Sequence, residues 1–479
     1  MNMTRFCRCL LAVALLISPI LSPAQIQNGA LHPRTRKPAQ HRTARPRVAN
    51  HKYTCGSPPC VLPNVQVSAD ETNTPLIASS PTNPSLLAAS TFDFSECNYI
   101  TLSMASLEGG SQWQYPNCVS VGFDGNPTLA YGRKSLYNAG FENSDKGTYI
   151  QASRDDGQFW GGSVEVTAPI FYDGVTNVPW VAVDNSKSSQ FANAVYLSVT
   201  QFDDLVVESE ITASRSTDGG KSWSTVTVDP VQYKPEVDQF SRLAVGMDGT
   251  VYLAWQRCAM TGPEVNCADT QADMLLSKST DGGETWSSPV TIATVTLVPD
   301  SCRCSFFGNL PNTNEPMPNM PVLAIDNSTG KYAGSLYGAM YNWTGSQMLV
   351  EVATSTDGGS TWGTPVLVAP ANETHDQFFP TIAVSSTGVL GVGWLDRRND
   401  PLNVSYQPFA AVSTDGGASF GTNYQLAKNL SDPYLDGQGG ADMGTNIGAA
   451  WSGTNFLVTW PDTRSLQYMQ DYVGGLRIK

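Results

Sequence analysis

Histidine is scarce in this sequence, with four residues in 479, and His375 is the one that follows residue 53. Paired Cys-x-x-Cys motifs are missing as well, which removes the usual ligand set of a structural zinc site. A hydrolase of the Ser-His-Asp type would have to use His375, and no glycine-rich loop opens a helix to hold a phosphate. These absences leave carboxylates or a tyrosine for any chemistry, and we expect neither a metal nor another cofactor.

Long hydrophobic runs are confined to the amino terminus. Arg5 and Arg8 precede the apolar residues 10–21, and Ser22-Pro-Ala24 follows them, which is the order of a secretory signal peptide. The run is too short to cross a bilayer, and no later run is longer. We therefore predict a signal peptide at residues 1–24. We expect the protein to be a monomer without a membrane span, and to be secreted, periplasmic or held at the cell surface.

Acidic residues are absent from the first 53 positions, which hold nine of the 28 Lys and Arg residues. The rest of the chain carries 19 basic and 42 acidic residues, a net charge of −23. The polar, proline-containing composition of residues 25–53 predicts a disordered basic arm, with a spacer or a wall tether as its role. A body this acidic repels phosphate backbones and anionic membranes, so nucleic acid is not an expected partner.

Eight cysteines remain after the predicted signal peptide, at positions 55, 60, 97, 118, 258, 267, 302 and 304. An even number in an exported chain favours disulfides, although eight cysteines allow 105 pairings. Cys258 and Cys267 bracket one loop and are the first pair that we predict. A zinc site is the alternative, but one histidine and no Cys-x-x-Cys pair speak against it.

Glycine and aspartate, by contrast, recur in a fixed pattern. Ser216-Thr-Asp218-Gly-Gly220-Lys-Ser-Trp223 is one copy of an eight-residue motif, called the box below. Residues 413–420 end in Phe in place of Trp, and residues 106–113 form a weaker copy with Glu in place of Asp. The boxes occupy residues 106–113, 153–160, 216–223, 279–286, 355–362 and 413–420. Such self-similarity indicates a repeat architecture.

Short alternating runs rich in β-branched and aromatic residues surround each box. Around the third box they are residues 179–184, 195–199 and 210–216, with 224–228 after it. Four strands separated by Gly, Asp and Asn turns, repeated without any helical pattern, predict an all-β fold, a β-propeller of four-stranded antiparallel blades. Residues 54–479 are then one domain.

Six units carry a box, and a seventh after residue 446 stops at three strands. Residues 64–68 would supply its fourth strand and close the ring, which pairs both terminal edges. We predict seven blades, with six as the alternative if the first unit only decorates the ring.

The box is expected to be structural. Its Asp and Ser side chains can accept hydrogen bonds from nearby backbone N–H groups, its glycines permit positive φ, and its aromatic ring packs onto the blade. A calcium loop is the alternative, but it needs several oxygen ligands and a distal Glu, and the box offers one carboxylate.

Ser-x-Asp-x-Gly-x-x-Trp, repeated between third and fourth strands, resembles the Asp-box (BNR) repeat of sialidases, or neuraminidases, and related propellers over about residues 64–479. The resemblance implies an exo-acting hydrolase that removes terminal sialic acid. In that family three arginines hold the substrate carboxylate, a Tyr with a Glu partner is the nucleophile, and an Asp is the acid and base. The early Phe-Arg-Ile-Pro motif of the family is absent, so no residue is transferred from it.

The rim opposite the boxes is where we expect an axial site. Trp394-Leu-Asp396-Arg-Arg398 and Trp460-Pro-Asp462-Thr-Arg464 end two second strands, and Trp255-Gln-Arg257 is a shorter relative. Arg257, Arg398 and Arg464 are therefore candidates for binding a sugar carboxylate. In the alternative interpretation, each Arg pairs with the Asp two residues before it and closes the end of a blade.

Two carboxylates are expected on the same rim. Asp238 and Asp376 both stand in Asp-Gln-Phe before a first strand, and paired carboxylates are what glycoside hydrolysis needs. They are our candidate catalytic residues, although the repetition also fits a structural role.

Two functional hypotheses follow from these patterns. The first is an exported sialidase-like glycosidase of the exo-alpha-sialidase type that acts on terminal sugars of glycans. The second is a noncatalytic secreted propeller that binds a glycan or a protein, for which a shallow, uncharged or blocked axial mouth would be the mark.

Overall fold

A computed structural model of the chain describes residue 53 and residues 55–119, 126–142, 146–171, 174–203, 207–260, 266–301, 305–370, 373–437 and 443–479. The predicted signal peptide, residues 25–52 of the predicted arm, Cys302 and Cys304 lie outside the described residues. The strands in chain order are β1 (Cys60–Gln66), β2 (Thr72–Ser79), β3 (Leu87–Asp93), β4 (Ile100–Ser106), β5 (Gln114–Val119), β6 (Thr128–Tyr131), β7 (Leu136–Phe141), β8 (Thr148–Ser153), β9 (Val164–Thr167), β10 (Val175–Val183), β11 (Val195–Asp203), β12 (Glu208–Ser216), β13 (Ser224–Tyr233), β14 (Glu236–Val245), β15 (Val251–Ala259), β16 (Gln271–Ser279), β17 (Val290–Thr296), β18 (Val322–Ile325), β19 (Leu336–Trp343), β20 (Met348–Ser355), β21 (Val366–Leu367), β22 (Gln377–Val384), β23 (Leu390–Asp396), β24 (Gln407–Ser413), β25 (Tyr424–Gln425), β26 (Ala449–Ser452), β27 (Asn455–Asp462) and β28 (Gln470–Arg477).

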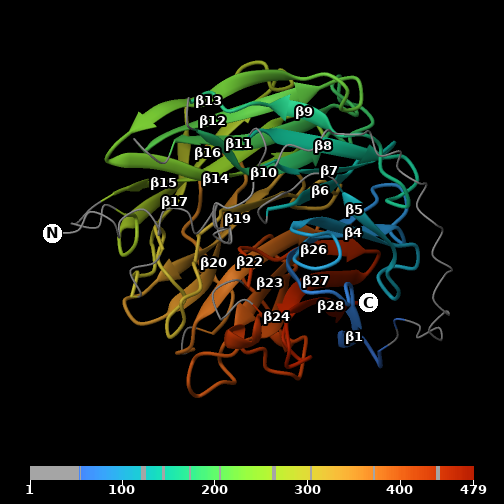
Figure 1. Cartoon of the computed structure of the whole chain (residues 1–479), viewed down its shortest axis with the longest axis vertical. Helices are drawn as coiled ribbons and strands as arrows, with labels where there is room; N and C mark the ends of the chain where they lie inside the picture. The colour runs from blue at the N-terminus through green and yellow to red at the C-terminus, as the bar shows by residue number, and fades with distance from the viewer. Residues whose placement is uncertain are drawn as a thin grey trace, which may run out of the picture.

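The strands form seven four-stranded antiparallel sheets, which confirms the predicted seven-bladed propeller. Blades 1 to 6 are consecutive groups of four strands from β2 to β25, and blade 7 has the order β1-β28-β27-β26. The first strands of the blades, β2, β6, β10, β14, β18, β22 and β26, each contact the next one around the ring. They surround the central axis, and the sheets are arranged around it in Figure 1.

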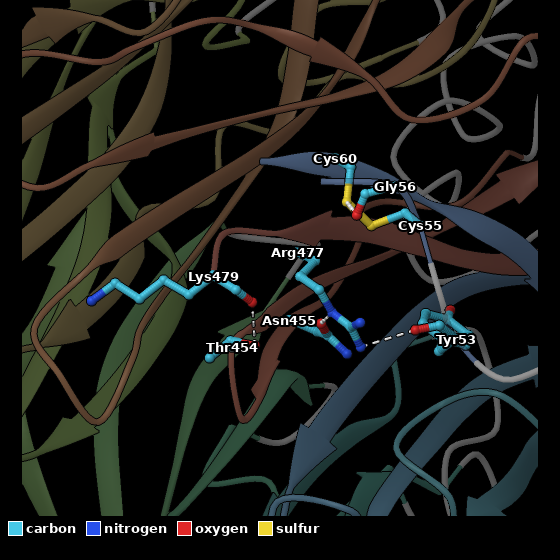
Figure 2. Close-up of a disulfide and its surroundings, with 8 residues drawn as sticks. All are labelled: Tyr53, Cys55, Gly56, Cys60, Thr454, Asn455, Arg477 and Lys479. Atoms are coloured by element: carbon cyan, nitrogen blue, oxygen red, sulfur yellow. Dashed lines mark hydrogen bonds between the residues drawn. A yellow bond between two sulfur atoms is a disulfide. The ribbon is translucent and has the colours of Figure 1, made fainter. Parts of the chain in front are cut away.

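The amino-terminal strand closes the ring, as predicted. β1 pairs antiparallel with β28, from Cys60 opposite Arg477 to Gln66 opposite Tyr472, and Figure 1 shows the blue β1 beside the red β28. Arg477 extends this junction, because its Nη2 donates to the carbonyl of Tyr53 at 2.9 Å (Figure 2). Tyr53, which we assigned to the arm, is buried in the hydrophobic cluster between blades 7 and 1.

Each box lies in the turn between the third and fourth strands of its blade. In blade 3, Ser216 Oγ donates to Asp218 at 2.8 Å and accepts from the backbone N–H of Gly220 at 2.8 Å. The same Ser-to-Gly contact occurs in the other five boxes, at 2.7 to 2.9 Å. Hydrogen bonds from Ser222 hold the pKa of Asp218 well below its usual range. The box is therefore a self-satisfied turn, as expected, and it defines one end of the ring, called the box rim.

The opposite end of the ring is called the far rim. It carries the loops between second and third strands and the segments that lead into each first strand, called lead-in segments below. Three disulfides are present among the described cysteines: Cys55–Cys60, Cys97–Cys118 and Cys258–Cys267. The last confirms the pair predicted first, and it joins the end of β15 to the far-rim loop that follows.

Four first strands contain the same irregularity. The pairing register shifts within β2, β10, β14 and β22, and at each shift a non-glycine residue has positive φ: Thr74, Val178, Phe240 and Phe379, with φ between 44° and 65°. A bulge of this kind bends a strand and redirects its side chains. It therefore sets which residues of the first strands point toward the axis.

Helix is nearly absent from the described part of the chain, where the one helix is a 3-10 turn at Pro433–Leu435. Within those residues no helix is long and apolar enough to cross a membrane.

Gly475→Ala should destabilise the ring at its closure. A Cβ at this position in the central strand β28 would overlap the backbone carbonyl of Phe456, so the strands of blade 7 would have to separate. We expect the free energy of unfolding, measured by denaturant titration with tryptophan fluorescence, to fall by about 3 kcal/mol or more. Gly162→Ala is the control, because its added Cβ meets nothing within 4 Å. Equal stability of the two variants would contradict this account of closure.

Candidate functional site

Arg398 is bound to the carboxylate two residues before it. Its Nε donates to Asp396 Oδ1 at 2.9 Å, and its Nη2 donates to Asp396 Oδ2. Trp394 Nε1 donates to the same Oδ2 at 2.7 Å, so the Trp-x-Asp-x-Arg motif is a closed unit. The guanidinium stacks on the ring of Phe409 at 4.4 Å, and both Nη atoms lie 3.3 Å from Asn423 Oδ1.

Arg464 repeats this geometry in blade 7. Its Nε and Nη2 donate to Asp462 at 2.8 and 2.6 Å, and Trp460 Nε1 donates to the same carboxylate at 2.9 Å. The guanidinium lies 3.9 Å from the ring centroid of Tyr472, and Nη2 reaches Asn64 Oδ1 at 3.3 Å.

Both arginines extend away from the axis. Each follows a second strand, stacks on a residue of the third strand and bonds an Asn at the fourth. Those two Asn side chains then donate to backbone carbonyls of the preceding blade, Asn423 to Val368 at 3.1 Å and Asn64 to Leu426 at 2.8 Å. Each Arg therefore pairs with the Asp two residues before it, as in the alternative interpretation of the sequence. Through its Asn partner, the motif also joins its blade to the preceding one. The recurrence of Trp-x-Asp-x-Arg in the sequence is consistent with this structural role in joining blades.

Asp238 and Arg257 are brought together, but as a pair at the junction of blades 3 and 4. Arg257 Nε and Nη2 donate to the two oxygens of Asp238, both at 2.7 Å, and Nη2 also bonds Asp229 of β13. Asp238 is fully buried. Burial raises the pKa of its carboxyl to about 7, against the opposing effect of Arg257.

Asp376 occupies the corresponding place in blade 6 and is also fully buried. Its Oδ1 accepts from the backbone N–H of Met348 in blade 5 at 2.9 Å, and its Oδ2 accepts from Asn403 Nδ2 at 2.7 Å. Arg397 Nη1 lies 3.4 Å from the same Oδ2. Burial raises the pKa of Asp376. Neither candidate carboxylate therefore presents a free oxygen to a substrate in this conformation.

The far end of the axis is crossed by the lead-in segment of blade 7. Thr445 Oγ1 donates to Asn126 of blade 2 at 3.0 Å, and Thr445 N lies 3.4 Å from Thr74 Oγ1 of blade 1. On the other side, Asn446 Nδ2 is 3.9 Å from the sulfur of Met320, which leads into blade 5. One segment therefore contacts three other blades across the ring.

Arg242 fills the axis beneath this segment. The bulge of β14 directs its guanidinium between Trp180, 4.3 Å from the ring centroid, and the sulfur of Met320, 2.6 Å from Nη2. No carboxylate within the described residues pairs with Arg242. Burial lowers its pKa to about 9, so it remains a cation at neutral pH.

Sequence reasoning missed a buried cluster of acids around Tyr406. Tyr406 is fully buried and donates to the carbonyl of Pro461 at 2.9 Å. Burial raises its pKa well above the usual range. The negative charges of four carboxylates, on blade 7 and on the lead-in segments of blades 5 and 7, act in the same direction. Those carboxylates belong to Asp462, Glu315, Asp471 and Asp436. The phenol is therefore held in its neutral form, and no sequence motif connects the residues that enforce this.

Glu315 and Arg397 border the same cluster. Glu315 is buried and accepts from the backbone N–H of Met443, at 3.1 and 3.0 Å for its two oxygens. Arg397, also buried, donates through Nη1 to the carbonyl of Pro311 at 2.7 Å and interacts electrostatically with Tyr406. The arrangement brings a Tyr, a Glu and one Arg into the same region beneath the far rim.

His375 lies on the far rim with a carboxylate partner. Its Nδ1 is 3.1 Å from Glu373 Oε1, and Glu373 Oε2 is 3.7 Å from Arg398 Nε. Ser419 stands in the one Gly-x-Ser-x-Gly stretch of the box in blade 6, but it donates to Asp415 in the turn at the opposite rim. The two rims separate this serine from His375, so they do not form a hydrolase dyad.

In the described residues, no group of three or more His, Cys, Asp or Glu side chains is placed to hold a metal ion.

No protein-family model matches the chain, and no curated protein matches it. Solved structures do match. An ulvan lyase from a family of polysaccharide lyases has a TM-score of 0.52 and 13% identity, covering 85% of this chain and 95% of that one. The Hadza microbial sialidase Hz136 has a TM-score of 0.44 and 14% identity over 82% and 76%. An α-L-arabinofuranosidase of Fusarium graminearum has a TM-score of 0.45 and 10% identity over 87% and 98%. At these identities the likeness establishes the fold alone.

Arg464→Ala should cost stability. Removal of the guanidinium leaves Asp462 buried with only Trp460 and one backbone N–H as donors, and breaking a largely buried pair typically costs about 3 kcal/mol. We expect that loss in the free energy of unfolding measured with denaturant. The exposed Arg154→Ala serves as the control. Unchanged stability of Arg464→Ala would contradict the structural role of the motif.

Asp471→Asn should flatten the pH dependence of stability. Burial raises the pKa of Asp471 from 3.8 to about 7, so between these pH values the unfolded chain releases a proton that the folded chain keeps. One such group lowers the free energy of unfolding as pH rises, by roughly 1.4 kcal/mol per unit up to about pH 7. Unfolding titrations from pH 4 to 8 should give a shallower decline for the variant. An identical slope would show that Asp471 is ionised in the folded protein.

Proposed function

We propose that the protein is an exported propeller that binds a glycan without cleaving it. The observation that carries this proposal is that, within the described residues, the lead-in segment of blade 7 crosses the far end of the axis above Arg242. An enzyme of this architecture needs open space there for a terminal sugar. The predicted signal peptide and the three disulfides support export.

The fold supports a glycan as the ligand. An ulvan lyase structure bound to a disaccharide of GlcA and sulfated rhamnose has a TM-score of 0.51 to this chain at 13% identity. Many glycan-acting proteins build their sites on the loops of such rings, although fold alone does not define activity.

Charge favours an uncharged glycan over a polyanionic one. The chain after residue 53 carries a net charge of −23, which repels polyanions. The candidate arginines are also already bonded to Asp238, Asp396 and Asp462. A sialic acid carboxylate would have to displace these aspartates and leave them unpaired, at a cost of about 3–5 kcal/mol for each buried pair.

A sialidase-type exo-glycosidase is the second candidate, and the proximity of Tyr406, Glu315 and Arg397 is the observation in its favour. The resemblance to sialidases implies a Tyr nucleophile with a Glu partner. Tyr406 is fully buried and its hydroxyl donates to Pro461, so a substrate would reach it only after the residues around it had moved. One arginine in place of three, and a phenol held neutral by its surroundings, weaken this candidate.

Binding and catalysis can be separated in one set of measurements. We expect the purified protein to bind at least one neutral glycan on an array, confirmed by calorimetry, and to release no sugar from fluorogenic glycosides, including the sialoside. Release that is lost in Tyr406→Phe and Glu315→Gln would overturn the noncatalytic proposal in favour of the glycosidase. Absence of binding to any glycan, charged or neutral, would sink both.

A further inference from the structure

A groove of about 770 Å³ opens on the box rim, opposite the rim where sequence reasoning placed the site. Blade 5 contributes Asp326, Lys331 and Tyr332 from the turn between its first two strands, and blade 6 contributes Thr387 and Gly388 from the equivalent turn. Its volume lies in the range of sites that hold small ligands, about 300–1,000 Å³.

The box of blade 6 and the closure of the ring complete the groove. Thr414, Asp415 and Thr422 line it from the box hairpin. Pro59, which precedes β1, and Lys479, which follows β28, also line the groove. Figure 2 shows Lys479 beside Thr454. One wall of the groove therefore comes from the residues that flank the β1–β28 pair.

Asp326 supplies an acceptor without a partner. The residue is 1% exposed, its Oδ1 accepts from Ser328 N at 2.8 Å, and its Oδ2 has no hydrogen-bond partner among the described residues. Gly388 packs against that Oδ2, since a Cβ on the glycine would lie 2.9 Å from it, and less than 1 Å² of the oxygen is accessible. A buried acceptor without a donor costs about 1–3 kcal/mol, which a ligand hydroxyl recovers once the turn that carries Gly388 moves aside.

The charges of the lining cancel. The carboxylates of Asp326 and Asp415 oppose an anion, and the ammonium groups of Lys331 and Lys479 oppose a cation. A purely apolar ligand would leave Asp326 unpaired. The remaining lining combines Thr and Ser hydroxyls, the half-buried rings of Tyr332 and Tyr424, and the apolar side chains of Pro59, Val389, Val412 and Ile478. Such a lining suits a molecule with hydroxyl donors and apolar faces.

We infer that this groove binds a neutral sugar segment of the glycan, with Asp326 accepting from a sugar hydroxyl. The inference rests on the proposed function and deepens it, because it places the binding site on the box rim and specifies an uncharged ligand.

Two variants test the groove, each with a control at the equivalent place in another blade. Thr414→Trp fills the groove from an exposed position of the box, and Thr280→Trp adds the same side chain to the box of blade 4. Asp326→Asn changes the acceptor, and Asp184→Asn changes the equivalent turn of blade 3, where Asp184 Oδ2 is also without a partner. The probes are neutral trisaccharides (cellotriose, mannotriose, arabinotriose and galactotriose), measured by saturation-transfer NMR and calorimetry.

We expect at least one neutral trisaccharide to bind the full-length protein, and Thr414→Trp and Asp326→Asn to weaken that binding tenfold or more, with both controls within twofold of the wild type. If a trisaccharide binds and the groove variants match their controls, the groove assignment fails while the proposed function stands. If charged glycans bind and the four trisaccharides do not, the neutral-sugar assignment fails alone. If no glycan of either kind binds, both fail.

Discussion

Each blade can bury the faces of its sheet only against its two neighbours, so the stability of every blade depends on the ring being closed. A four-stranded sheet has two faces and no core of its own. Blades 2 to 6 obtain both neighbours from simple chain order, whereas blades 1 and 7 become neighbours only when the ring closes. Blade 7 is different, because its outer strand comes from the other end of the described chain. The pairing of β1 with β28 therefore supports every other interface, and Arg477, Tyr53 and the Cys55–Cys60 disulfide gather around it.

The buried charged groups at the far rim form contacts within and between blades. Asp238, Asp376, Asp396 and Asp462 are fully or almost fully buried, and each is held by an arginine or by backbone N–H groups. Buried carboxylates tolerate this position only with such partners. This role in packing explains why the polar motifs Trp-x-Asp-x-Arg and Asp-Gln-Phe recur in more than one blade. The box rim, whose turns are satisfied by their own Ser and Asp, carries a groove of about 770 Å³.

The fold was predictable because its signals are local. The Ser of each box bonds a glycine four residues later, so spacing alone identifies the turn, and three strands after residue 446 indicate a missing fourth. Cys258 and Cys267 are near each other in sequence, so their pairing could be predicted.

The direction of the Arg398 side chain could not be predicted from the sequence, because it depends on Phe409, Asn423 and a carbonyl of the preceding blade. Tyr406 was missed for the same reason, since the carboxylates around it come from several blades and share no motif. The groove on the box rim is assembled from three blades, and no segment of sequence contains it.

The pairing of β1 with β28 also imposes an order on folding. Cys60 and Arg477 are partners across almost the whole described chain, and contacts between such distant residues form slowly because a long loop must close first. During synthesis β1 is made before any strand of blade 7, so its hydrogen-bonding edge remains without its partner until β28 has emerged. An unpaired edge of this kind is a template for misassociation. The chain therefore remains vulnerable from the synthesis of β1 until β28 has been made, and a delay anywhere between these two strands lengthens that period.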